Sequence, residues 1–426
     1  MSPKPIVVFD ATILAVGNIK DGARSGIFWV SWNLFKEFVR SDKFTLQLYC
    51  QPTQYTELIE FLREQFPHKR FNFINQAEMG KFTILYSKMR ARKEQAKRNG
   101  RALHKNMYHL LATGCRVFST VEKIQAKTWT RQLKSALFFF SPVYAAPEVF
   151  KNEPCLTRVF MLYDAMPVLF PHFFPNGCTW FMELVHSMNN KDLYFTDSHS
   201  ARQDFLKVAP QIPPEHITTA YIASNQPYQP ERDAEKLKKV KEKYNIPQDK
   251  TYIFSLCTLE IRKNIPFAID NFIRFCEKNH ITDQILVLGG SFQDKRLDKY
   301  KKSPYVKFIG YVDDEDLQTL YSAAYAFVYP SLYEGFGMPI LEAMSCGCPV
   351  ICSNTSSMPE VIGDCGILID PTQGQTLVEA FERMHTDKGI QQSCREKGLA
   401  RANQFSWAKC MQVIADKLLA HLNAAQ

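Results

Sequence analysis

Short apolar runs alternate with segments of helical periodicity through the second half of the sequence. The apolar runs cover residues 252–257, 285–288, 306–309, 324–329, 350–352 and 366–369. Helical patterns such as 264–278 and 316–323 lie between most of them. Short buried strands that alternate with helices are typical of parallel βαβ units, so the pattern predicts a doubly wound α/β sheet.

The first half shows this alternation less regularly, with strand-like runs at 6–9, 46–50, 138–140, 158–162 and 193–196. A chain of 426 residues exceeds the size that one hydrophobic core usually serves, so two domains are expected. A polar passage from Asn225 and a charged helical pattern at 234–244 separate the halves. We expect one domain over residues 1–224 and another over 225–405. The final helical pattern begins at Ser406, a good N-cap residue, and we expect residues 406–426 to pack back onto the first domain.

The composition is that of an ordinary globular protein, with 46% hydrophobic and 22% charged residues. No apolar run approaches the roughly 20 residues that cross a bilayer, and the N-terminus lacks the features of a signal peptide. The 12 cysteines are scattered, which fits reduced thiols in a cytosolic protein. Cys346, Cys348 and Cys352 lie close together but lack a second ligand cluster, so we expect no zinc site.

Positive charge is concentrated in one segment. Residues 81–134 contain 14 Lys and Arg against two acids, a net +12, whereas the whole chain carries +9. The segment is either a solvated helical insertion or a surface that attracts anionic lipid headgroups, at about 1 kcal/mol per basic residue. The basic residues that define it are Lys88, Arg90, Arg92, Lys93, Lys97, Arg98 and Arg101. No nucleic-acid recognition motif accompanies the charge, so we expect no nucleic-acid partner.

Three loops at predicted strand ends carry residues suited to a ligand, and ligands of open α/β sheets bind at the carboxyl ends of the strands. Arg262 and Lys263 follow the run at 252–257, where two cations before a helix suit a pyrophosphate. Gly289 begins a Gly-Gly-Ser turn after the run at 285–288. Taken singly, a solvated cation pair or a tight turn would explain these features equally well.

The third loop, Tyr-Glu-Gly-Phe-Gly-Met-Pro-Ile-Leu-Glu at 333–342, follows the run at 324–329. Its glycines allow close approach of the backbone to a ligand, and Pro339 suits a first helical position. Glu334 would then lie on the loop and Glu342 in the first helical turn, near the positive end of the helix dipole. Amide donors and carboxylates in this arrangement suit the hydroxyls of a sugar nucleotide. A plain turn before a dipole-matched glutamate is the alternative.

Residues 251–371 resemble the nucleotide-sugar-binding domain of retaining GT-B glycosyltransferases, family four. The matching pieces are Thr-Leu-Glu-Ile-Arg-Lys-Asn at 258–264, Phe-Ile-Gly-Tyr-Val at 308–312, the 333–342 element and Pro-Glu-Val-Ile-Gly-Asp-Cys-Gly at 359–366. The first half is similar more faintly, at Ser25-Gly26-Ile27, Tyr163-Asp164-Ala-Met-Pro167 and the segment from Ser198 to Asp204. Residues 51–135 have no counterpart. The resemblance implies a GT-B architecture, in which two Rossmann-like domains face each other across a cleft.

The resemblance also implies roles for individual residues. Arg262 and Lys263 would hold the donor diphosphate and stabilise it as a leaving group, without a metal or other cofactor. Glu342 would bind the ribose, and Glu334 with the amides of Phe336 and Gly337 would bind the transferred sugar. The remaining implied donor-binding positions are Gly26 near the phosphates, the backbone of Tyr311 and Val312 at the base, Gly289 and Gly335. Asp164 would lie near the reacting centre and, with Glu334, Arg262 and Lys263, completes the catalytic candidates.

Two positions depart from the family pattern. Tyr163 stands where the family often has His, which leaves the acceptor-side roles open, and Cys257 stands where a Gly is usual. A formal Asp-x-Asp motif at Asp314 and Asp316 resembles the metal site of other glycosyltransferases. We expect instead that Asp313 is the N-cap of the helix that follows.

The function implied is retaining transfer of a sugar from a nucleoside-diphosphate sugar to a glycan or lipid-linked saccharide, in surface polysaccharide or glycoconjugate synthesis. The enzyme would be cytoplasmic, with residues 81–134 offering attachment to the inner face of a membrane. Another GT-B enzyme that uses sugar nucleotides, such as an epimerase or a phosphorylase, is one alternative. A non-catalytic nucleotide-sugar-binding or membrane-docking protein is the other.

Overall fold

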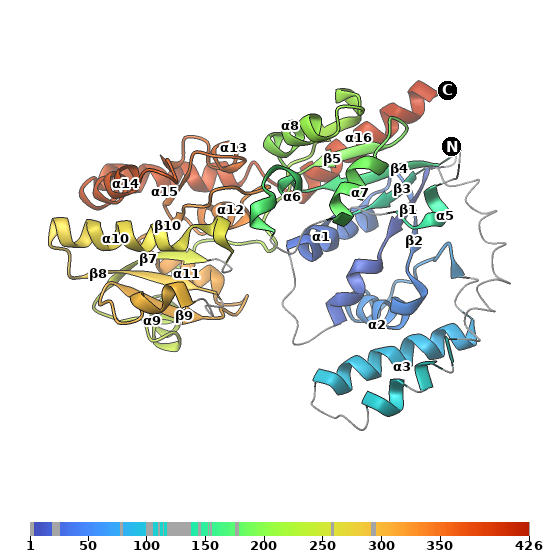
Figure 1. Cartoon of the computed structure of the whole chain (residues 1–426), viewed down its shortest axis with the longest axis horizontal. Helices are drawn as coiled ribbons and strands as arrows, with labels where there is room; N and C mark the ends of the chain where they lie inside the picture. Colours follow the sequence, from blue (N-terminus) through green and yellow to red (C-terminus); the bar gives the residue numbers. More distant parts are fainter. Residues whose placement is uncertain are drawn as a thin grey trace.

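The computed structural model has two lobes, each built on a six-stranded parallel sheet (Figure 1). The structure describes residues 4–18, 26–76, 80–98, 105–109, 111–113, 115–116, 138–143, 146–151, 153, 156–174, 179–256, 260–290 and 295–425. Four positions named in the sequence analysis lie outside these residues: Ser25, Arg101, Cys257 and Ser291.

The sheet of the first lobe is parallel throughout. In sheet order its strands are β2 (Thr45–Tyr49), β1 (Ile6–Asp10), β3 (Phe138–Ser141), β4 (Thr157–Leu162), β5 (Leu193–Thr196) and β6 (Ile217–Thr219). The first five match the predicted runs. The sequence did not predict β6, because this edge strand has only three residues and its middle and last residues are only half-buried.

Aromatic packing joins the first sheet to its helices. The ring of Phe9 in β1 lies 5.4 Å from Phe35, 5.6 Å from Phe38 and 5.6 Å from Phe140. Such ring pairs add to the free energy gained by burial, so β1, β3 and α1 form one packed unit. The helices of this lobe are α1 (Gly26–Arg40), α2 (Tyr55–Gln65), α3 (Lys81–Arg98), α5 (Glu148–Lys151), α6 (Met166–Leu169), α7 (Thr179–Ser187) and α8 (His199–Val208).

The second sheet confirms the doubly wound parallel arrangement predicted from the sequence. In sheet order its strands are β12 (Gly366–Ile369), β11 (Val350–Ser353), β10 (Ala326–Tyr329), β7 (Thr251–Leu256), β8 (Gln284–Gly289) and β9 (Val306–Gly310). Its helices are α9 (Ala234–Lys243), α10 (Ile265–Asn279), α11 (Leu317–Ala323), α12 (Met338–Ser345), α13 (Met358–Ile362), α14 (Gly374–Thr386) and α15 (Lys388–Ala402).

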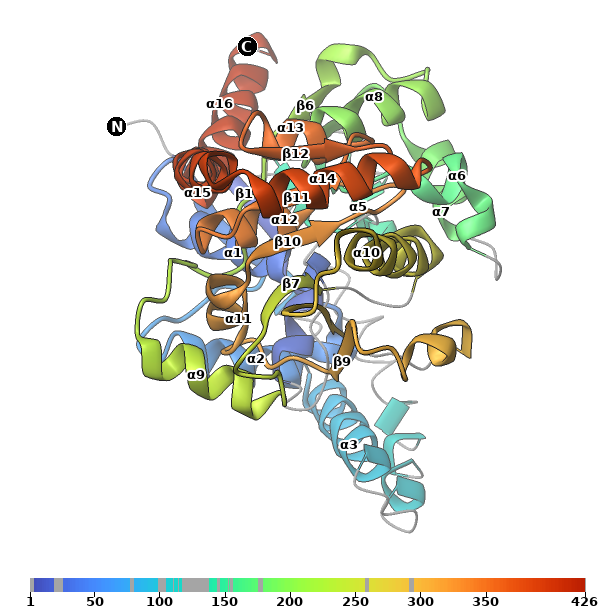
Figure 2. The same ribbon diagram turned by 90° about the vertical axis from the view of Figure 1, so that its left-hand side faces the viewer.

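Helices cover both faces of the second sheet. Leu286 and Val328 pack in one hydrophobic cluster with residues of α10 and α14, whereas Val287 and Phe327 pack in another with residues of α11 and α12. Figure 2 shows α10 on one side of β7 and α11 on the other. Because both faces are buried, these strands are apolar at nearly every position, which is why the sequence revealed them.

The last helix, α16 (Trp407–Ala425), packs against α1 of the first lobe. The Trp407 indole donates to the backbone oxygen of Ser224 at 2.9 Å, and Lys417 Nζ donates to the backbone oxygen of Glu215 at 2.6 Å. Residues 225–233 contain neither helix nor strand. We propose that the chain divides into domains at 1–224 and 225–405, with α16 returning to the first.

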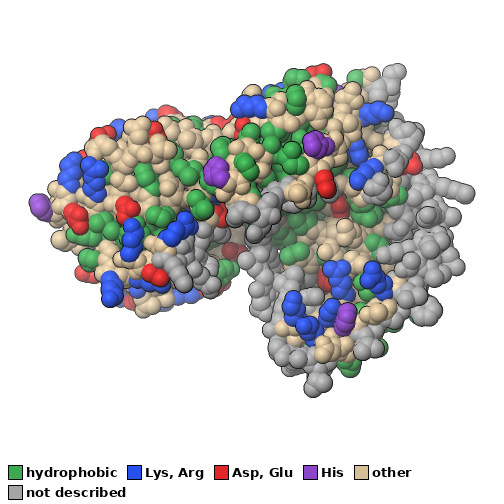
Figure 3. Space-filling model, in the orientation of Figure 1, with side chains coloured by type: hydrophobic (Ala, Val, Ile, Leu, Met, Phe, Trp, Pro, Cys, Tyr) green, Lys and Arg blue, Asp and Glu red, His purple; other side chains and the backbone are tan. Residues whose placement is uncertain are grey.

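Helix α3 projects from the first lobe, together with helical residues 105–109 and 111–113 (Figure 1, cyan). Figure 3 shows blue Lys and Arg side chains gathered at this end of the lobe. Lys88, Arg90, Arg92 and Lys97 are exposed there. Among the helices of the described residues, none combines the length and the apolar character that crossing a bilayer requires.

Candidate active site

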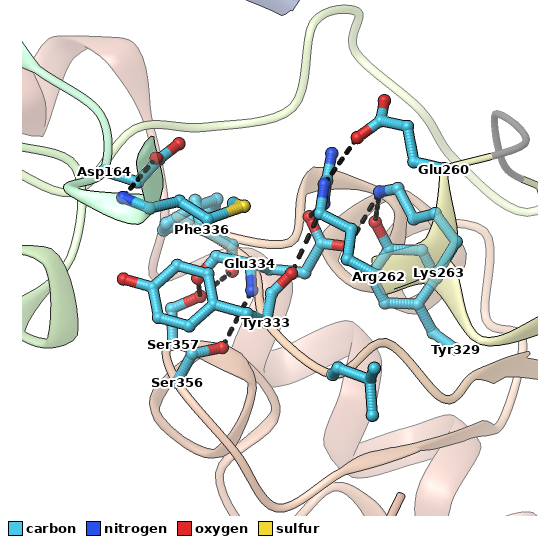
Figure 4. Close-up of polar contacts among 12 residues, drawn as sticks. Asp164, Glu260, Arg262, Lys263, Tyr329, Tyr333, Glu334, Phe336, Ser356 and Ser357 are labelled. Atoms are coloured by element: carbon cyan, nitrogen blue, oxygen red, sulfur yellow. Dashed lines mark hydrogen bonds and ion pairs between the residues drawn. The ribbon is translucent and has the colours of Figure 1, made fainter. Parts of the chain in front are cut away.

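Arg262, Lys263 and Glu334 form a compact ion-paired cluster at the carboxyl edge of the second sheet (Figure 4). The two cations lie in a short 3-10 turn between β7 and α10, and Glu334 follows β10. Glu334 accepts hydrogen bonds at 2.7 Å from Arg262 Nη1 and at 2.7 Å from Lys263 Nζ. Adjacent strands β7 and β10 therefore bring together residues that are more than 70 positions apart in the sequence.

Strong electrostatic coupling accompanies this geometry. Burial by itself would raise the pKa of Glu334, but the charges of Lys263 and Arg262 outweigh it and hold that pKa at about 2. Glu334 is therefore ionised, and two cations face one buried carboxylate. Glu260 adds a second, half-exposed carboxylate beside Arg262, at 2.6 Å from its Nε. Two cations and two carboxylates leave the cluster without net charge. Its cations lie at the sheet edge, where a diphosphate could bind.

The loop from Glu334 to Gly337 is held through its carbonyl groups. Ser357 Oγ donates to the backbone oxygens of Glu334 at 3.0 Å and of Phe336 at 2.9 Å. Within the described residues, the backbone N–H groups of Gly335, Phe336 and Gly337 donate to no protein acceptor. Backbone donors nearly always have partners when they are buried, so these three N–H groups are available to a ligand. Residues 334–337 are called the ligand loop.

Glu342 lies further into α12 than the sequence predicted. The helix begins at Met338, after Gly337 with φ +95°, and Pro339 is its second residue. Glu342 is therefore the fifth helical residue, and the prediction that it occupies the first turn is wrong. Its carboxylate accepts from the Tyr321 hydroxyl at 3.2 Å, and burial raises its pKa to about 7.

Asp164 comes from the first lobe and lies against the same loop. A Cβ on Gly335 would meet the backbone oxygen of Tyr163 at 2.8 Å and Asp164 Cβ at 3.3 Å, so only glycine fits there. Asp164 Oδ1 accepts from the backbone N–H of Met166 at 2.9 Å. Burial raises the pKa of Asp164 to about 6, although the nearby Arg262 charge lowers it. The structure therefore brings Asp164 and the Glu334 loop together.

Tyr163 points away from the loop and into the first lobe. Its side chain is 7% exposed, and its hydroxyl donates to the backbone oxygen of Pro142 at 2.6 Å. Burial raises the pKa of this hydroxyl above its usual range. Tyr163, which stands where the resembled family often has His, is thus part of the core. Its side chain does not face the ligand loop.

The remaining donor-binding candidates lie along the same edge. A Cβ on Gly289, at the end of β8, would lie 2.9 Å from Val312 Cγ2, and Tyr311 after β9 is 65% exposed. A Cβ on Gly26, the first residue of α1, would lie 3.0 Å from Met338 Cε at the start of α12. Gly26 therefore reaches the second lobe beside the ligand loop.

The Asp-x-Asp motif is engaged in other contacts. Asp316, and not Asp313, is the N-cap position of α11, so the predicted cap is wrong by three residues. Lys243 Nζ lies 2.7 Å from Asp313 Oδ2 and also pairs with Asp316, which accepts from the Tyr244 hydroxyl. Across the described part of the chain, no three His, Cys, Asp or Glu side chains gather as a metal site.

Several residues that position the site were not predicted from the sequence. Tyr329 accepts from Lys263 Nζ at 2.6 Å, and Ser356 Oγ accepts from the backbone N–H of Glu334 at 2.9 Å. Ser357 holds the carbonyls of Glu334 and Phe336. The Ser356-Ser357 pair precedes α13 at a strand end, and that position on the ligand-binding edge is the one clue that could have identified it.

Comparisons with known proteins identify the class of protein. The family model "Glycosyl transferases group 1" matches residues 237–401. The O-antigen chain mannosyltransferase B of Escherichia coli is 33% identical over 275 residues, which cover 63% of this chain and 71% of that protein. The serotype-specific mannosyltransferase WbdA of E. coli is 28% identical over 287 residues, 65% of this chain but 35% of that protein. The match therefore spans about a third of WbdA.

Solved structures show the same fold at low identity. Sucrose-phosphate synthase from Thermosynechococcus elongatus superimposes with a TM-score of 0.63 at 16% identity, over 99% of this chain and 100% of that one. Anabaena Alr3699/HepE in complex with UDP and glucose gives 0.63 at 17%, over 98% and 100%. These comparisons and the two six-stranded parallel sheets define a GT-B glycosyltransferase. The chain belongs to the glycosyl transferases group 1 family.

Proposed function

We propose that this glycosyltransferase moves a sugar, with retention of configuration and without a metal, from a nucleoside-diphosphate sugar to a glycan or lipid-linked saccharide. The observation that carries the proposal is the Glu334 carboxylate, fixed between Arg262 and Lys263 and followed by three backbone N–H groups without protein partners. Cations suit a diphosphate, and a carboxylate with amide donors suits sugar hydroxyls.

Each of the site residues has its own role in the transfer. Arg262 and Lys263 stabilise the negative charge that grows on the diphosphate as the anomeric C–O bond breaks. Glu334 accepts from hydroxyls of the departing sugar, since each of its oxygens has a further lone pair beyond its bond to a cation. Glu342 accepts from the ribose, and Asp164 lies beside the reacting centre.

Retention follows when the acceptor attacks the face that the diphosphate leaves. The acceptor hydroxyl forms the new C–O bond on that face, and its proton passes to the departing phosphate oxygen. This route requires no protein nucleophile, and the fixed cations supply the stabilisation of the leaving group. An epimerase or a phosphorylase would instead release no new glycoside, so product analysis separates these alternatives.

Mannose is the sugar that we propose to be transferred, in the synthesis of a surface polysaccharide. Support comes from relatives whose names describe mannosyltransferases, including one of O-antigen chains. We expect a nucleoside-diphosphate mannose to raise the melting temperature and to be hydrolysed slowly. The matched control is the same nucleotide carrying glucose, each sugar being tested with guanine and with uracil as the base. Equal responses to both sugars would contradict the assignment of mannose.

Attachment to the inner face of a membrane is a further part of the proposal. The projecting end of the first lobe combines exposed basic side chains with exposed apolar ones, a composition that suits a surface of anionic lipids. The exposed apolar residues there are Phe82, Leu85, Met107 and Leu111, with exposed fractions of 42%, 40%, 48% and 49%.

Neutralising four exposed cations tests this attachment. Changing Lys88, Arg90, Arg92 and Lys97 to Gln removes attraction of about 1 kcal/mol per charge, so affinity for phosphatidylglycerol vesicles should fall by roughly 1,000-fold at low salt. Vesicle sedimentation measures the affinity. Lys238→Gln with Lys239→Gln in α9 is the control for exposed charge elsewhere. A wild-type protein that does not sediment with anionic vesicles would exclude the attachment.

A further inference from the structure

The hydroxyl group of Ser198 caps α8 in the first lobe and also bonds to the second lobe. Ser198 follows β5 and is fully buried. Its Oγ accepts from the backbone N–H of Ala201 at 3.0 Å, which makes it the N-cap of α8. The same hydroxyl donates to the backbone oxygen of Gly335 at 2.6 Å, in the ligand loop of the other lobe. Thr196 Oγ1 donates to the backbone oxygen of Ser198 at 3.0 Å and fixes its position.

Three consecutive carbonyls of the ligand loop are held by two serines. Ser357, from the same lobe, holds the carbonyls of Glu334 and Phe336, whereas Ser198 holds the carbonyl of Gly335 between them. In a planar trans peptide, the carbonyl of one residue and the N–H of the next point in opposite directions. Ser198 thus fixes the peptide plane that carries the Phe336 N–H, one of the donors without a protein partner.

The position of α8 is set by the second lobe as well. Glu360 in α13 accepts from the backbone N–H groups of His199 and Ser200, each at 2.9 Å, and from the Tyr221 hydroxyl at 2.8 Å. A helix leaves its first N–H groups without internal partners, and a carboxylate there also suits the helix dipole. Further along α8, Asp204 accepts from the Tyr333 hydroxyl. The helix is therefore attached to the second lobe on both sides of the ligand loop.

We propose that Ser198 is a positioning residue for sugar transfer, and that it acts across the domain boundary by aiming the Phe336 N–H at the donor sugar. Since Gly335 also packs against Tyr163 and Asp164, the hydroxyl of Ser198 links the arrangement of the two domains to the geometry of the sugar site. The inference rests on the proposed function, and it assigns to the first domain a part in shaping the donor site of the second.

Ser198→Gly separates this role from helix capping, because Gly is a tolerated N-cap residue but has no hydroxyl. We expect the kcat of transfer to fall by about 10- to 100-fold, since small misplacements of groups around a reacting centre cost this much. The affinity for the nucleoside diphosphate should stay within about threefold, because the cations and Glu342 are untouched. Ser198→Cys, whose thiol is a weaker donor, should give an intermediate kcat.

Ser200→Ala is the matched control, because Ser200 lies two residues along and only its backbone N–H bonds to Glu360. It should leave kcat unchanged. Glu360→Gln weakens the attachment of α8 without touching the ligand loop, and it should also lower kcat with little change in nucleotide affinity. This variant keeps the proposal testable if Ser198→Gly does not fold.

The outcomes distinguish this inference from the function on which it rests. If Glu334→Gln loses transfer while the Ser198 and Glu360 variants keep the wild-type kcat, the positioning role of Ser198 is wrong and the function stands. A loss of nucleotide affinity as large as the loss of kcat would also overturn it. If Glu334→Gln keeps full transfer, the proposed function itself fails.

Discussion

Glu334→Gln should lower the rate of sugar transfer at saturating donor by about 100- to 1,000-fold, the loss that follows removal of one electrostatic contact to a transition state. Glutamine keeps the shape of the side chain but is uncharged, so no anion would lie between Arg262 and Lys263. The sugar hydroxyls would lose an ionised acceptor, and the two cations would lose their fixed orientation. Steady-state transfer with saturating acceptor measures the effect.

Glu260→Gln is the matched control. Glu260 pairs with the same Arg262 at 2.6 Å, but its side chain is 52% exposed, whereas that of Glu334 is 8% exposed. Exposed ion pairs contribute little, so this change should alter transfer by less than about threefold. Undiminished transfer by Glu334→Gln, or an equal loss in both variants, would contradict the role given to Glu334.

The stability of Glu334→Gln should respond to nucleotide more strongly than that of the wild type. Removing one partner of a buried ion pair costs about 3–5 kcal/mol, because the other charge is left buried without compensation. A bound diphosphate supplies negative charge to the same cations and offsets part of this cost. Thermal unfolding with and without nucleoside diphosphate should therefore show the larger increase in melting temperature for the variant, and a smaller increase would place the diphosphate elsewhere.

Glu342 should make folding stability fall as the pH rises through the neutral range. Its pKa is 4.5 ordinarily and about 7 in the folded protein. Between these values the folded state keeps a proton that the unfolded state has lost, so the free energy of unfolding decreases with rising pH. The shift corresponds to a decrease on the order of 3 kcal/mol, complete above the folded-state pKa.

Glu342→Gln removes this titration. Urea unfolding at about pH 5 and about pH 8 should show that the stability difference between variant and wild type moves in favour of the variant at the higher pH. Nucleotide binding should move the other way in the wild type. A carboxylate that accepts from ribose hydroxyls is ionised, so nucleotide affinity should rise by up to about tenfold from pH 6 to pH 8. A pH-independent difference in both measurements would contradict the role of Glu342.

The edge of the second sheet could be predicted because its strands are buried on both faces and are therefore continuously apolar. Strand ends then placed Arg262, Lys263 and Glu334 on one edge, where the structure finds them. These residues lie in a short turn and a loop, where sequence periodicity does not indicate side-chain direction, so the ion pairs between them could not be predicted. The same limit applies to Tyr163, whose position beside Asp164 did not reveal that it turns into the core.

Helix starts were predicted least accurately from the sequence. Pro339 suits several first-turn positions, so the true start at Met338 moved Glu342 out of the first turn. Three aspartates compete for the cap of α11, and the structure selects Asp316. Contacts across the two lobes, such as those of Ser198 and Glu360, depend on how the domains meet, and no local pattern encodes that arrangement.

The configuration of the product is the most direct test of the central claim, that this site transfers a sugar with retention. Purified protein, an α-linked nucleoside-diphosphate mannose and a mannoside acceptor should yield a new glycoside, whose anomeric configuration NMR reports. The account predicts an α-mannoside and its loss in Glu334→Gln. A β-linked product, or an altered donor with no new glycoside, would contradict it.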